Sequence, residues 1–211
     1  MRLVGLTGGI ATGKSTFAEA LRRLGAPVVD ADELARRVVA KGSPGLAAVV
    51  AAFGPEVLTA GGELDRKKLG SRVFADAGAR ARLEAITHPA IRAALADELG
   101  RLEEAGAGLA FYDVPLLYEV GMEGLVDCVV VVYAPPASQL LRLERRDGLT
   151  HEEARARLRA QLPIDDKAAR ADVLVTNEAD PAALRAKAGP LLRDLAAGLS
   201  RKLPNAPPKR Y

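Results

Sequence analysis

The chain has 211 residues, of which 49% are hydrophobic and 27% are charged, and its formal net charge is +3. This length and composition predict one main globular domain with insertions, and so small a charge does not call for nucleic acid as a partner. The single cysteine, Cys128, excludes a disulfide framework within the chain, and its apolar surroundings predict a core residue. No signal peptide or membrane-length apolar run is visible, so we expect a cytoplasmic protein without membrane association or an obligatory protein partner.

Short apolar segments alternate with helical patterns along the chain, which is typical of a parallel α/β sheet. We expect strands over residues 2–6, 27–29, 109–112, 126–133 and 173–175. We expect helices over about 13–24 and 138–146, a third opened by the capping box that begins at Thr150, and a fourth that begins at Asp180 and Pro181. The valine-rich run before Tyr133 indicates a strand that is buried on both faces.

A glycine-rich segment lies between the first predicted strand and the first predicted helix, and it matches the pattern G-x-x-x-x-G-K-[ST] at every fixed position. The matching residues are Gly8, Gly9, Ile10, Ala11, Thr12, Gly13, Lys14 and Ser15. Glycines let the backbone curl so that successive N–H groups point at phosphate oxygens, and the following helix adds its N-terminal dipole. Lys14 would bridge the β- and γ-phosphates, and the Ser15 hydroxyl would help to coordinate Mg²⁺.

Two helical insertions interrupt the predicted sheet, and turn signals such as Gly42-Ser43-Pro44-Gly45 break the first of them. We therefore expect an α/β fold of the P-loop NTPase type, with a parallel sheet flanked by helices. The predicted parts are a discontinuous nucleotide-binding core (1–32, 107–137 and 168–200), helical insertions over 33–106 and 138–167, and a flexible tail over 201–211, where three prolines disfavour a helix.

Three acidic residues follow predicted strands, where parallel sheets bind their ligands. Asp30 and Asp32 flank Ala31 after the second strand, and a carboxylate there can orient an acceptor hydroxyl or hold Mg²⁺ through water. An equally good alternative makes Asp32 the N-cap of the helix that follows. Asp113 ends a strand of four apolar residues, a weak Walker-B-like signal that predicts a carboxylate near the metal.

Arg142, Arg145 and Arg146 lie at positions i, i+3 and i+4 of a predicted helix in the second insertion, so they share one face. Arginines on a mobile lid can close over a triphosphate and neutralise its charge. A solvated basic face, paired with Glu144 or Glu152, is the alternative, and it is favoured for Arg145 and Arg146.

The chain resembles the bacterial dephospho-coenzyme A kinases over about residues 3–195. The segments that carry the resemblance are Leu6-Thr7-Gly8-Gly9-Ile10, Gly13-Lys14-Ser15-Thr16, Val29-Asp30-Ala31-Asp32, Gly42-Ser43-Pro44, Leu64-Asp65-Arg66, Val73-Phe74, Ile86-Thr87-His88-Pro89, Ile91-Arg92, Asp113-Val114-Pro115-Leu116-Leu117-Tyr118-Glu119, Gln139, Arg142-Leu143, Arg145-Arg146, Ala160-Gln161-Leu162-Pro163, Lys167, Ala171-Asp172 and Asn177. The glycine loop is shared with many proteins, whereas the Asp-Ala-Asp, Thr-His-Pro and Asp-Val-Pro-Leu-Leu segments in this order are much more specific.

The resemblance implies that the protein phosphorylates the ribose 3′-hydroxyl of dephospho-coenzyme A with ATP and Mg²⁺, the last step of coenzyme A synthesis. It makes 33–106 the acceptor domain and 138–167 the lid. It makes Asp32 the base or metal-linked acid, with Lys14 and Arg142 as the other catalytic residues. It implies that ATP is bound by the loop from Gly8 through Thr16 together with Arg142 and Asn177. The residues that it assigns to acceptor binding are Thr7, Asp32, His88, Arg92 and Leu117. The residues that it assigns to metal binding are Ser15, Asp32 and Asp113.

One position departs from the family pattern, because Ala11 stands where the family usually has glycine. Alanine resists a positive φ. If this loop position requires a positive φ, the substitution weakens nucleotide binding or slightly reshapes the loop; if it does not, the substitution is silent.

Three other functions compete with this one. A nucleoside or nucleoside-monophosphate kinase shares the loop and the lid, although an insertion of about 70 residues suits a bulkier acceptor. A GTP-driven switch usually carries Asn-Lys-x-Asp and Asp-x-x-Gly, whereas here Glu178 follows Asn177 and Val-Pro-Leu follows Asp113. A nucleic-acid motor normally needs a larger or duplicated core.

Overall fold

The computed structural model describes residues 1–178, 180–198 and 206–211 and divides the chain into two compact units. The first unit is Met1–Val28 with Ala105–Tyr211, and the second is Val29–Glu104. Both boundaries of the second unit lie within a few residues of the limits expected for the first insertion. Residues 138–167, which we expect to form the second insertion, are part of the first unit and do not form a separate one.

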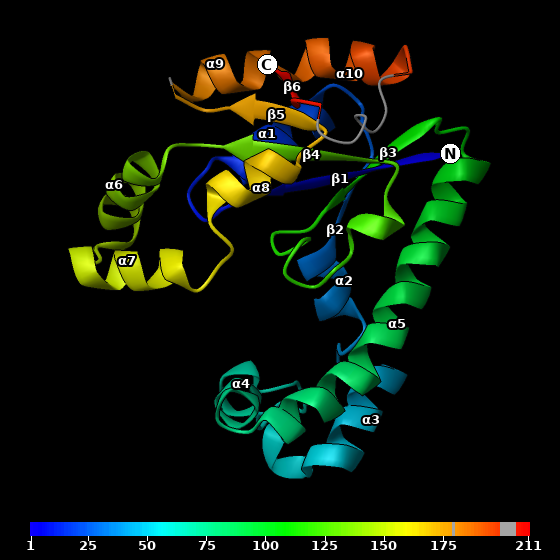
Figure 1. The fold of residues 1–211 in the computed structure, drawn as a ribbon. Coiled ribbons are helices and arrows are strands. Elements are labelled where there is room, and N and C mark those ends of the chain that lie inside the picture. Colours follow the sequence, from blue (N-terminus) through cyan, green and yellow to red (C-terminus); the bar gives the residue numbers. More distant parts are fainter. Residues whose placement is uncertain (179, 199–205) are drawn as a thin grey trace. The chain divides into compact units, whose positions relative to one another are not determined.

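A six-stranded sheet organises the chain, with strand order β2-β3-β1-β4-β5-β6 (Figure 1). Its strands are β1 (Arg2–Gly8), β2 (Val28–Asp30), β3 (Leu109–Asp113), β4 (Cys128–Tyr133), β5 (Val173–Thr176) and β6 (Lys209–Arg210). The pairings of β1 with β3 and β4, of β4 with β5 and of β5 with β6 are all parallel. The predicted parallel α/β class is therefore confirmed.

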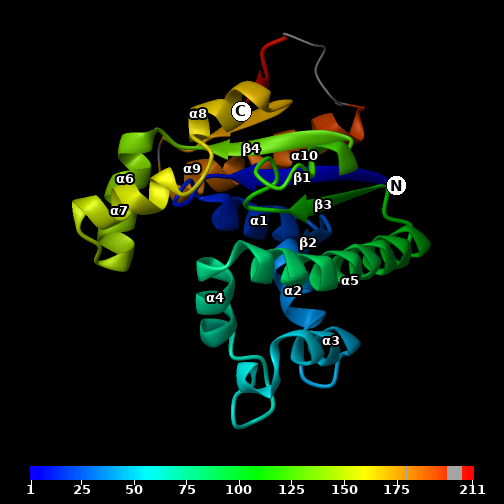
Figure 2. The same cartoon turned by 60° about the horizontal axis from the view of Figure 1, so that its bottom comes forward.

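Helices of the first unit lie on both faces of the sheet and beyond one of its ends (Figure 2). They are α1 (Lys14–Arg23), α6 (Pro136–Asp147), α7 (His151–Arg159), α8 (Ile164–Arg170), α9 (Pro181–Ala186) and α10 (Ala188–Ala196), with the short 3₁₀ helix η2 (Glu123–Leu125). Helices α1, α9 and α10 pack on one face, whereas α8 lies against β4 from the other. The expected capping box at Thr150 and the expected N-cap at Asp180 are both present.

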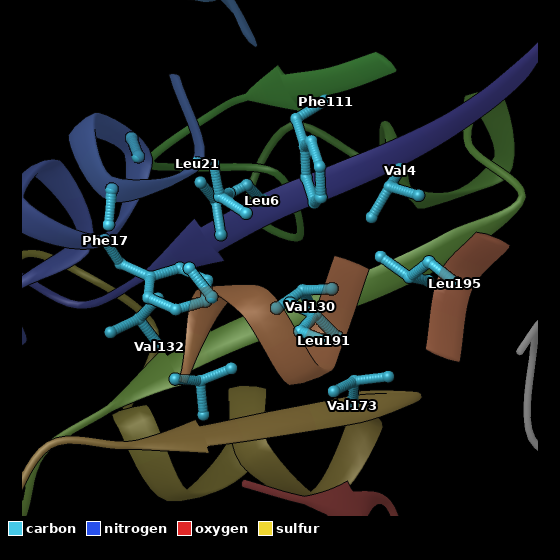
Figure 3. Close-up of a cluster of buried hydrophobic side chains, with 14 of the residues drawn as sticks. Val4, Leu6, Phe17, Leu21, Phe111, Val130, Val132, Val173, Leu191 and Leu195 are labelled. Atoms are coloured by element: carbon cyan, nitrogen blue, oxygen red, sulfur yellow. The ribbon is translucent and has the colours of Figure 1, made fainter. Parts of the chain in front are cut away.

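The core of the first unit forms between the inner faces of β1, β4 and β5 and the helices α1 and α10 (Figure 3). Phe17 and Leu21 of α1 meet Val130 and Val132 of β4, and all four side chains are buried. β4 is buried on both of its faces, as its run of valines predicts. Cys128 lies in this core, as expected for a structural cysteine.

The second unit is helical. It contains α2 (Ala31–Arg37), α3 (Pro44–Phe53), the 3₁₀ helix η1 (Pro55–Val57), α4 (Arg66–Ala75) and α5 (Ala77–Glu104). α5 contacts α2, α3 and α4, and a small core of Val49, Phe53, Val57 and Leu69 forms beside it. Pro89 lies inside α5 without ending it. Thr-His-Pro is therefore a helical segment.

The expected flexible tail is wrong for its last residues. Lys209 and Arg210 form β6, which adds a parallel strand beside β5, and Tyr211 continues this ladder by donating from its backbone N to the Leu174 carbonyl over 3.0 Å. The Lys209 ammonium and the Tyr211 hydroxyl both contact the Asp194 carboxylate of α10. Residues 201–205 lie outside the described part of the chain.

Candidate functional site

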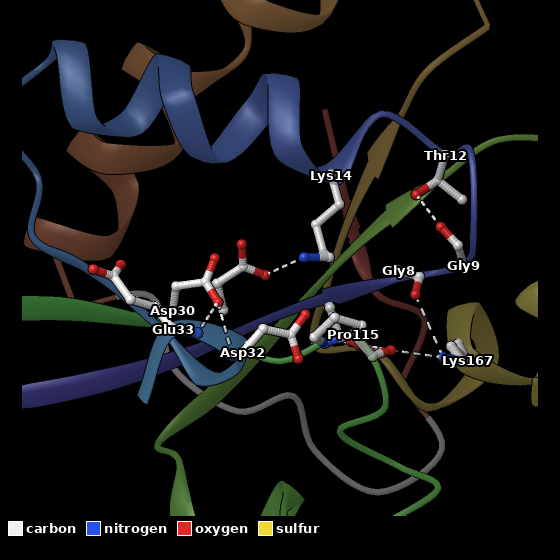
Figure 4. Close-up of polar contacts among 11 residues, drawn as sticks. Gly8, Gly9, Thr12, Lys14, Asp30, Asp32, Glu33, Pro115 and Lys167 are labelled. Carbon is white, nitrogen blue, oxygen red and sulfur yellow. Dashed lines mark hydrogen bonds and ion pairs between the residues drawn. The ribbon is translucent and has the colours of Figure 1, made fainter. Parts of the chain in front are cut away.

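The glycine-rich loop connects β1 to α1 and has the curled backbone that phosphate binding requires. Ala11 has φ 60° and Gly13 has φ 95°, so both lie in the left-handed region. The Thr12 hydroxyl closes the loop by donating to the Gly9 carbonyl over 2.8 Å (Figure 4). Gly13 precedes α1 and supplies no side-chain cap, so the first N–H groups of this helix remain available to an anion.

Ala11 is the only residue other than glycine with a positive φ in the described chain. The position thus requires the conformation that alanine resists, and the departure from the family pattern is not silent. We expect Ala11→Gly to raise the free energy of unfolding by about 1 kcal/mol, because glycine adopts this φ without a clash of its Cβ. Urea denaturation measures the change.

A matched control replaces Ala20, which is buried in the middle of α1. Ala20→Gly should lower the free energy of unfolding by about 1 kcal/mol, since glycine in a helix interior is unfavourable. If Ala11→Gly destabilises the protein as Ala20→Gly does, the contacts of the loop rather than the φ of Ala11 determine its stability.

Lys14 and Asp113 form an ion pair next to the loop. Lys14 begins α1, Asp113 ends β3, and the Lys14 ammonium contacts Asp113 Oδ1, with 14% and 4% of the two side chains exposed (Figure 4). Asp113 pairs in register with Leu6 of β1, so the strand order brings both groups to the carboxyl end of the sheet. Ser15 follows Lys14, and its side chain is exposed.

The acids of the second unit have separate roles. Asp30 is the N-cap of α2, because its Oδ1 accepts hydrogen bonds from the backbone N of Asp32 over 2.8 Å and of Glu33 over 3.1 Å (Figure 4). The alternative in which Asp32 caps this helix is therefore wrong. Asp32 lies in the first turn of α2 with an exposed side chain, so its carboxylate does not serve the cap.

Two glutamines from outside the loop hold its backbone at Ile10. Gln139 of α6 donates from Nε2 to the Ile10 carbonyl over 2.9 Å, and Oε1 of Gln161 accepts from the Ile10 N–H over 2.9 Å. Gln139 is 2% exposed, and its amide lies so close to Gly9 that a Cβ on that glycine would overlap it. Sequence reasoning gave neither glutamine a role, although both belong to the segments that carry the family resemblance.

Arg142 and Asn177 hold the next part of the loop. Arg142 donates to the carbonyl oxygens of Ala11 over 3.3 Å and of Asn177 over 3.0 Å. The Asn177 side chain donates from Nδ2 to the Thr12 carbonyl over 2.7 Å, and a Cβ on Gly13 would overlap its amide. The structure thus brings these two predicted ATP-binding residues to the loop, where they contact its backbone.

The other two arginines of α6 lie apart from the loop. Arg145 and Arg146 are exposed, and Arg146 forms a bidentate ion pair with Asp147 over 2.7 and 3.0 Å. Neither of the partners that we expected, Glu144 and Glu152, contacts Arg146 in the described ion pairs, and Glu144 instead meets the His151 ring over 2.8 Å. The solvated alternative therefore describes Arg146.

The predicted acceptor residues belong to both units. Thr7 and Leu117 of the first unit are fully buried. The Thr7 hydroxyl donates to the Pro115 carbonyl over 3.1 Å, and the Leu117 side chain lies so close to Gly5 that a Cβ on that glycine would come within 3.1 Å of it. In the second unit, His88 and Arg92 lie four residues apart on α5, which places them on one face of the helix. Arg92 is exposed and His88 is half-buried.

A pocket of about 320 Å³ lies beside the loop, between α6, the end of α7 and the start of α8. Gly9, Gln139 and Gln161 contribute to its wall. At its edge, Asp165 accepts a hydrogen bond from the Tyr133 hydroxyl over 3.0 Å. Burial and this carboxylate raise the pKa of Tyr133 above its ordinary value.

Mg²⁺ prefers oxygen ligands and is usually held by one or two protein groups together with phosphates and water. The Ser15 hydroxyl and the Asp113 carboxylate, next to the N-terminal end of α1 that has no side-chain cap, fit this pattern. Within the described residues, no three His, Cys, Asp or Glu side chains gather to hold a metal by themselves. Nor does any helix in those residues have the length and apolar character needed to cross a bilayer.

Comparisons with known proteins agree with this geometry. The family model described as dephospho-CoA kinase matches residues 2–182. A dephospho-CoA kinase of Anaeromyxobacter dehalogenans is 64% identical over 211 residues, which is the whole of both chains. One of Geobacter sulfurreducens is 50% identical over 181 residues, covering 86% of this chain and 92% of the relative.

Two solved structures share this fold. The crystal structure of TT1252 from Thermus thermophilus has a TM-score of 0.78 and 38% identity, covering 92% of this chain and 97% of the other. The dephospho-CoA kinase from Campylobacter jejuni has a TM-score of 0.72 and 32% identity, covering 94% of this chain and 99% of the other. The family model matches most of the chain, and relatives of that name are similar to it over most or all of their length. The chain therefore belongs to the dephospho-CoA kinase family.

Proposed function

We propose that this protein transfers the γ-phosphoryl group of ATP to the ribose 3′-hydroxyl of dephospho-coenzyme A. The observation that carries the proposal is the loop itself: a curled backbone, a helix N-terminus without a side-chain cap and Lys14 at its first position. Membership of the dephospho-CoA kinase family supplies the acceptor. As in other enzymes of this kind, ATP is the donor and a divalent cation, which we propose to be Mg²⁺, neutralises phosphate charge.

The chain's own residues have distinct tasks in this reaction. The loop amides and the N-terminus of α1 bind phosphate oxygens, and Lys14 stabilises the charge that moves toward the β–γ bridging oxygen as its bond to the γ-phosphorus breaks. We assign ATP-binding roles to Arg142 and Asn177 because both hold the loop that would cradle the phosphates. Ser15 and Asp113 would provide oxygen ligands for the cation, which would offset phosphate charge.

On the acceptor side we propose that Asp32 orients the 3′-hydroxyl and receives its proton as the oxygen bonds to the γ-phosphorus. The support is local: Asp30 already caps α2, whereas the Asp32 carboxylate is exposed directly after β2. His88 and Arg92, on one face of α5, fit a site for the anionic acceptor through ring N–H and guanidinium donors. Thr7 and Leu117 are buried in the first unit, and their support as acceptor residues is that both belong to the segments that carry the family resemblance.

A coupled assay of ADP release with ATP and Mg²⁺ tests the proposal. It compares dephospho-coenzyme A with AMP, CMP, UMP and adenosine as acceptors. We expect strong turnover with dephospho-coenzyme A alone, and a product that carries its new phosphate on the ribose 3′-oxygen by ³¹P NMR. Turnover with a monophosphate instead would support the proposed kinase activity and contradict the proposed acceptor. We also expect the enzyme to act in the cytoplasm, where its single cysteine stays reduced.

A further inference from the structure

Lys167 is a fully buried lysine of α8, with a relative exposure of 0%. Its ammonium contacts three oxygen atoms: Glu119 Oε1 over 2.7 Å, the Pro115 carbonyl over 3.0 Å and the Gly8 carbonyl over 3.4 Å (Figure 4). An ammonium has three N–H donors, so three oxygen partners match its capacity. A charge so deeply buried is costly unless its partners compensate for it, and here they do.

Two of these partners belong to the strand ends that carry the reaction. Gly8 is the last residue of β1 and the first of the phosphate-binding loop, and Pro115 lies two residues after Asp113 of β3. The Thr7 hydroxyl donates to the same Pro115 carbonyl over 3.1 Å. Lys167 thus ties the start of the loop that leads to Lys14 to the segment that follows Asp113.

The third partner extends this connection. Glu119 Oε1 accepts a hydrogen bond from the backbone N of Leu162 over 3.0 Å, immediately after Gln161, which holds Ile10 of the loop. One carboxylate therefore fixes the Lys167 ammonium and the segment that carries Gln161. An apolar residue would fill the same space in an ordinary core, often without loss of stability. A buried cation that joins three segments at the phosphate loop fits a functional role better.

We propose that Lys167 is a positioning residue for phosphoryl transfer. It touches no reacting atom; it sets the spacing between the phosphate loop and the end of β3, and with it the placement of Lys14 relative to Asp113. This inference rests on the proposed reaction. Phosphoryl transfer depends on placement, and a shift of about 1 Å in an active site can lower the rate by about 10²-fold.

The experiment compares four variants in the ADP-release assay. Lys167→Met removes the cation and keeps most of the side-chain length, and Lys167→Arg keeps a cation there. The double variant Lys167→Met with Glu119→Gln removes both charges, so that no unpaired buried charge prevents folding. The control is Asp172→Ala, because Asp172 is buried and accepts from the Val129 backbone N over 2.8 Å near the amino-terminal end of β4, away from the loop.

We expect kcat per folded molecule to fall by about 10²-fold in both variants that carry Lys167→Met, with the KM for dephospho-coenzyme A within about twofold of wild type. Lys167→Arg should recover at least a tenth of the lost activity. Asp172→Ala should lower the melting temperature and leave kcat per folded molecule unchanged. Circular dichroism gives the folded fraction.

The proposal is overturned if the double variant keeps a wild-type kcat, or if Lys167→Arg is as slow as Lys167→Met. Failure of the proposed function would look different, because the wild-type protein itself would then show no turnover with dephospho-coenzyme A. The double variant decides the question if Lys167→Met alone does not fold. If neither folds, Lys167→Arg decides it: kcat within twofold of wild type supports a cation at this position, and a loss as large as 10²-fold with native melting contradicts it.

Discussion

Asp32→Asn is expected to lower kcat by about 10²–10⁴-fold while leaving the affinity for ATP unchanged. The substitution keeps the shape of the side chain and removes the negative charge that would receive the proton of the acceptor hydroxyl. The cap of α2 is unaffected, since Asp30 provides it. The effect should therefore appear in turnover and not in folding. Initial rates with saturating ATP, together with fluorescent nucleotide titration, measure the two quantities separately.

The neighbouring acid Glu33 offers a matched control, because it is also exposed in the first turn of α2. Glu33→Gln makes the same change in net charge one residue further along the chain, and we expect its kcat to stay within twofold of the wild-type value. A kcat for Asp32→Asn close to that of Glu33→Gln would remove Asp32 from the mechanism. A loose transition state needs little base strength, so the lower end of the expected range would indicate orientation rather than proton transfer.

Lys14→Met should lower kcat/KM for ATP by about 10³-fold or more, a loss comparable to that expected for kcat in Asp32→Asn. Removing one donor that stabilises developing charge typically costs about 10²–10³-fold in kcat, and Lys14 is a full cation that we propose also binds the ground-state phosphates. Both kcat and nucleotide affinity should therefore fall. Steady-state kinetics over a range of ATP concentrations, and direct titration with ATP, separate the two losses.

Loss of stability has to be measured at the same time, because Lys14 is paired with the buried carboxylate of Asp113. The double variant Lys14→Met with Asp113→Asn removes the pair together and should melt closer to wild type than Lys14→Met. Lys209→Met removes an exposed cation in the same unit and should not change kcat/KM. Retention of a tenth or more of wild-type kcat/KM by folded Lys14→Met would contradict the assigned role.

Much of the fold could be predicted because its signals are local. The valines of β4, the capping box at Thr150 and the Asp-Pro start of α9 each fix an element through neighbouring residues, and each is found in the structure. β6 was missed because its stability comes from pairing with β5 and from contacts with Asp194. Two residues after a proline-rich segment carry no period that reveals such a strand.

The site divides in the same way. Gly8 to Ser15 could be identified because phosphate binding imposes fixed spacing on consecutive residues. Gln139 and Gln161 approach Ile10 from segments more than a hundred residues away, and no sequence pattern links them to the loop. The positive φ of Ala11 could only be posed as a condition, because the residue type is unfavourable to the conformation that the loop imposes.

The close contact between Gly9 and Gln139 has a consequence for how such sequences diverge. Because a Cβ at position 9 would overlap the Gln139 amide, a larger residue there would displace this side chain from its hydrogen bond to Ile10. Relatives that carry a larger residue at position 9 should then carry a shorter one at position 139. Gly13 and Asn177 form a second such pair. Substitutions at these loop positions are therefore expected to occur together with substitutions in α6 and after β5. A loop grafted alone into another kinase should not keep its conformation unless these partner residues are grafted with it.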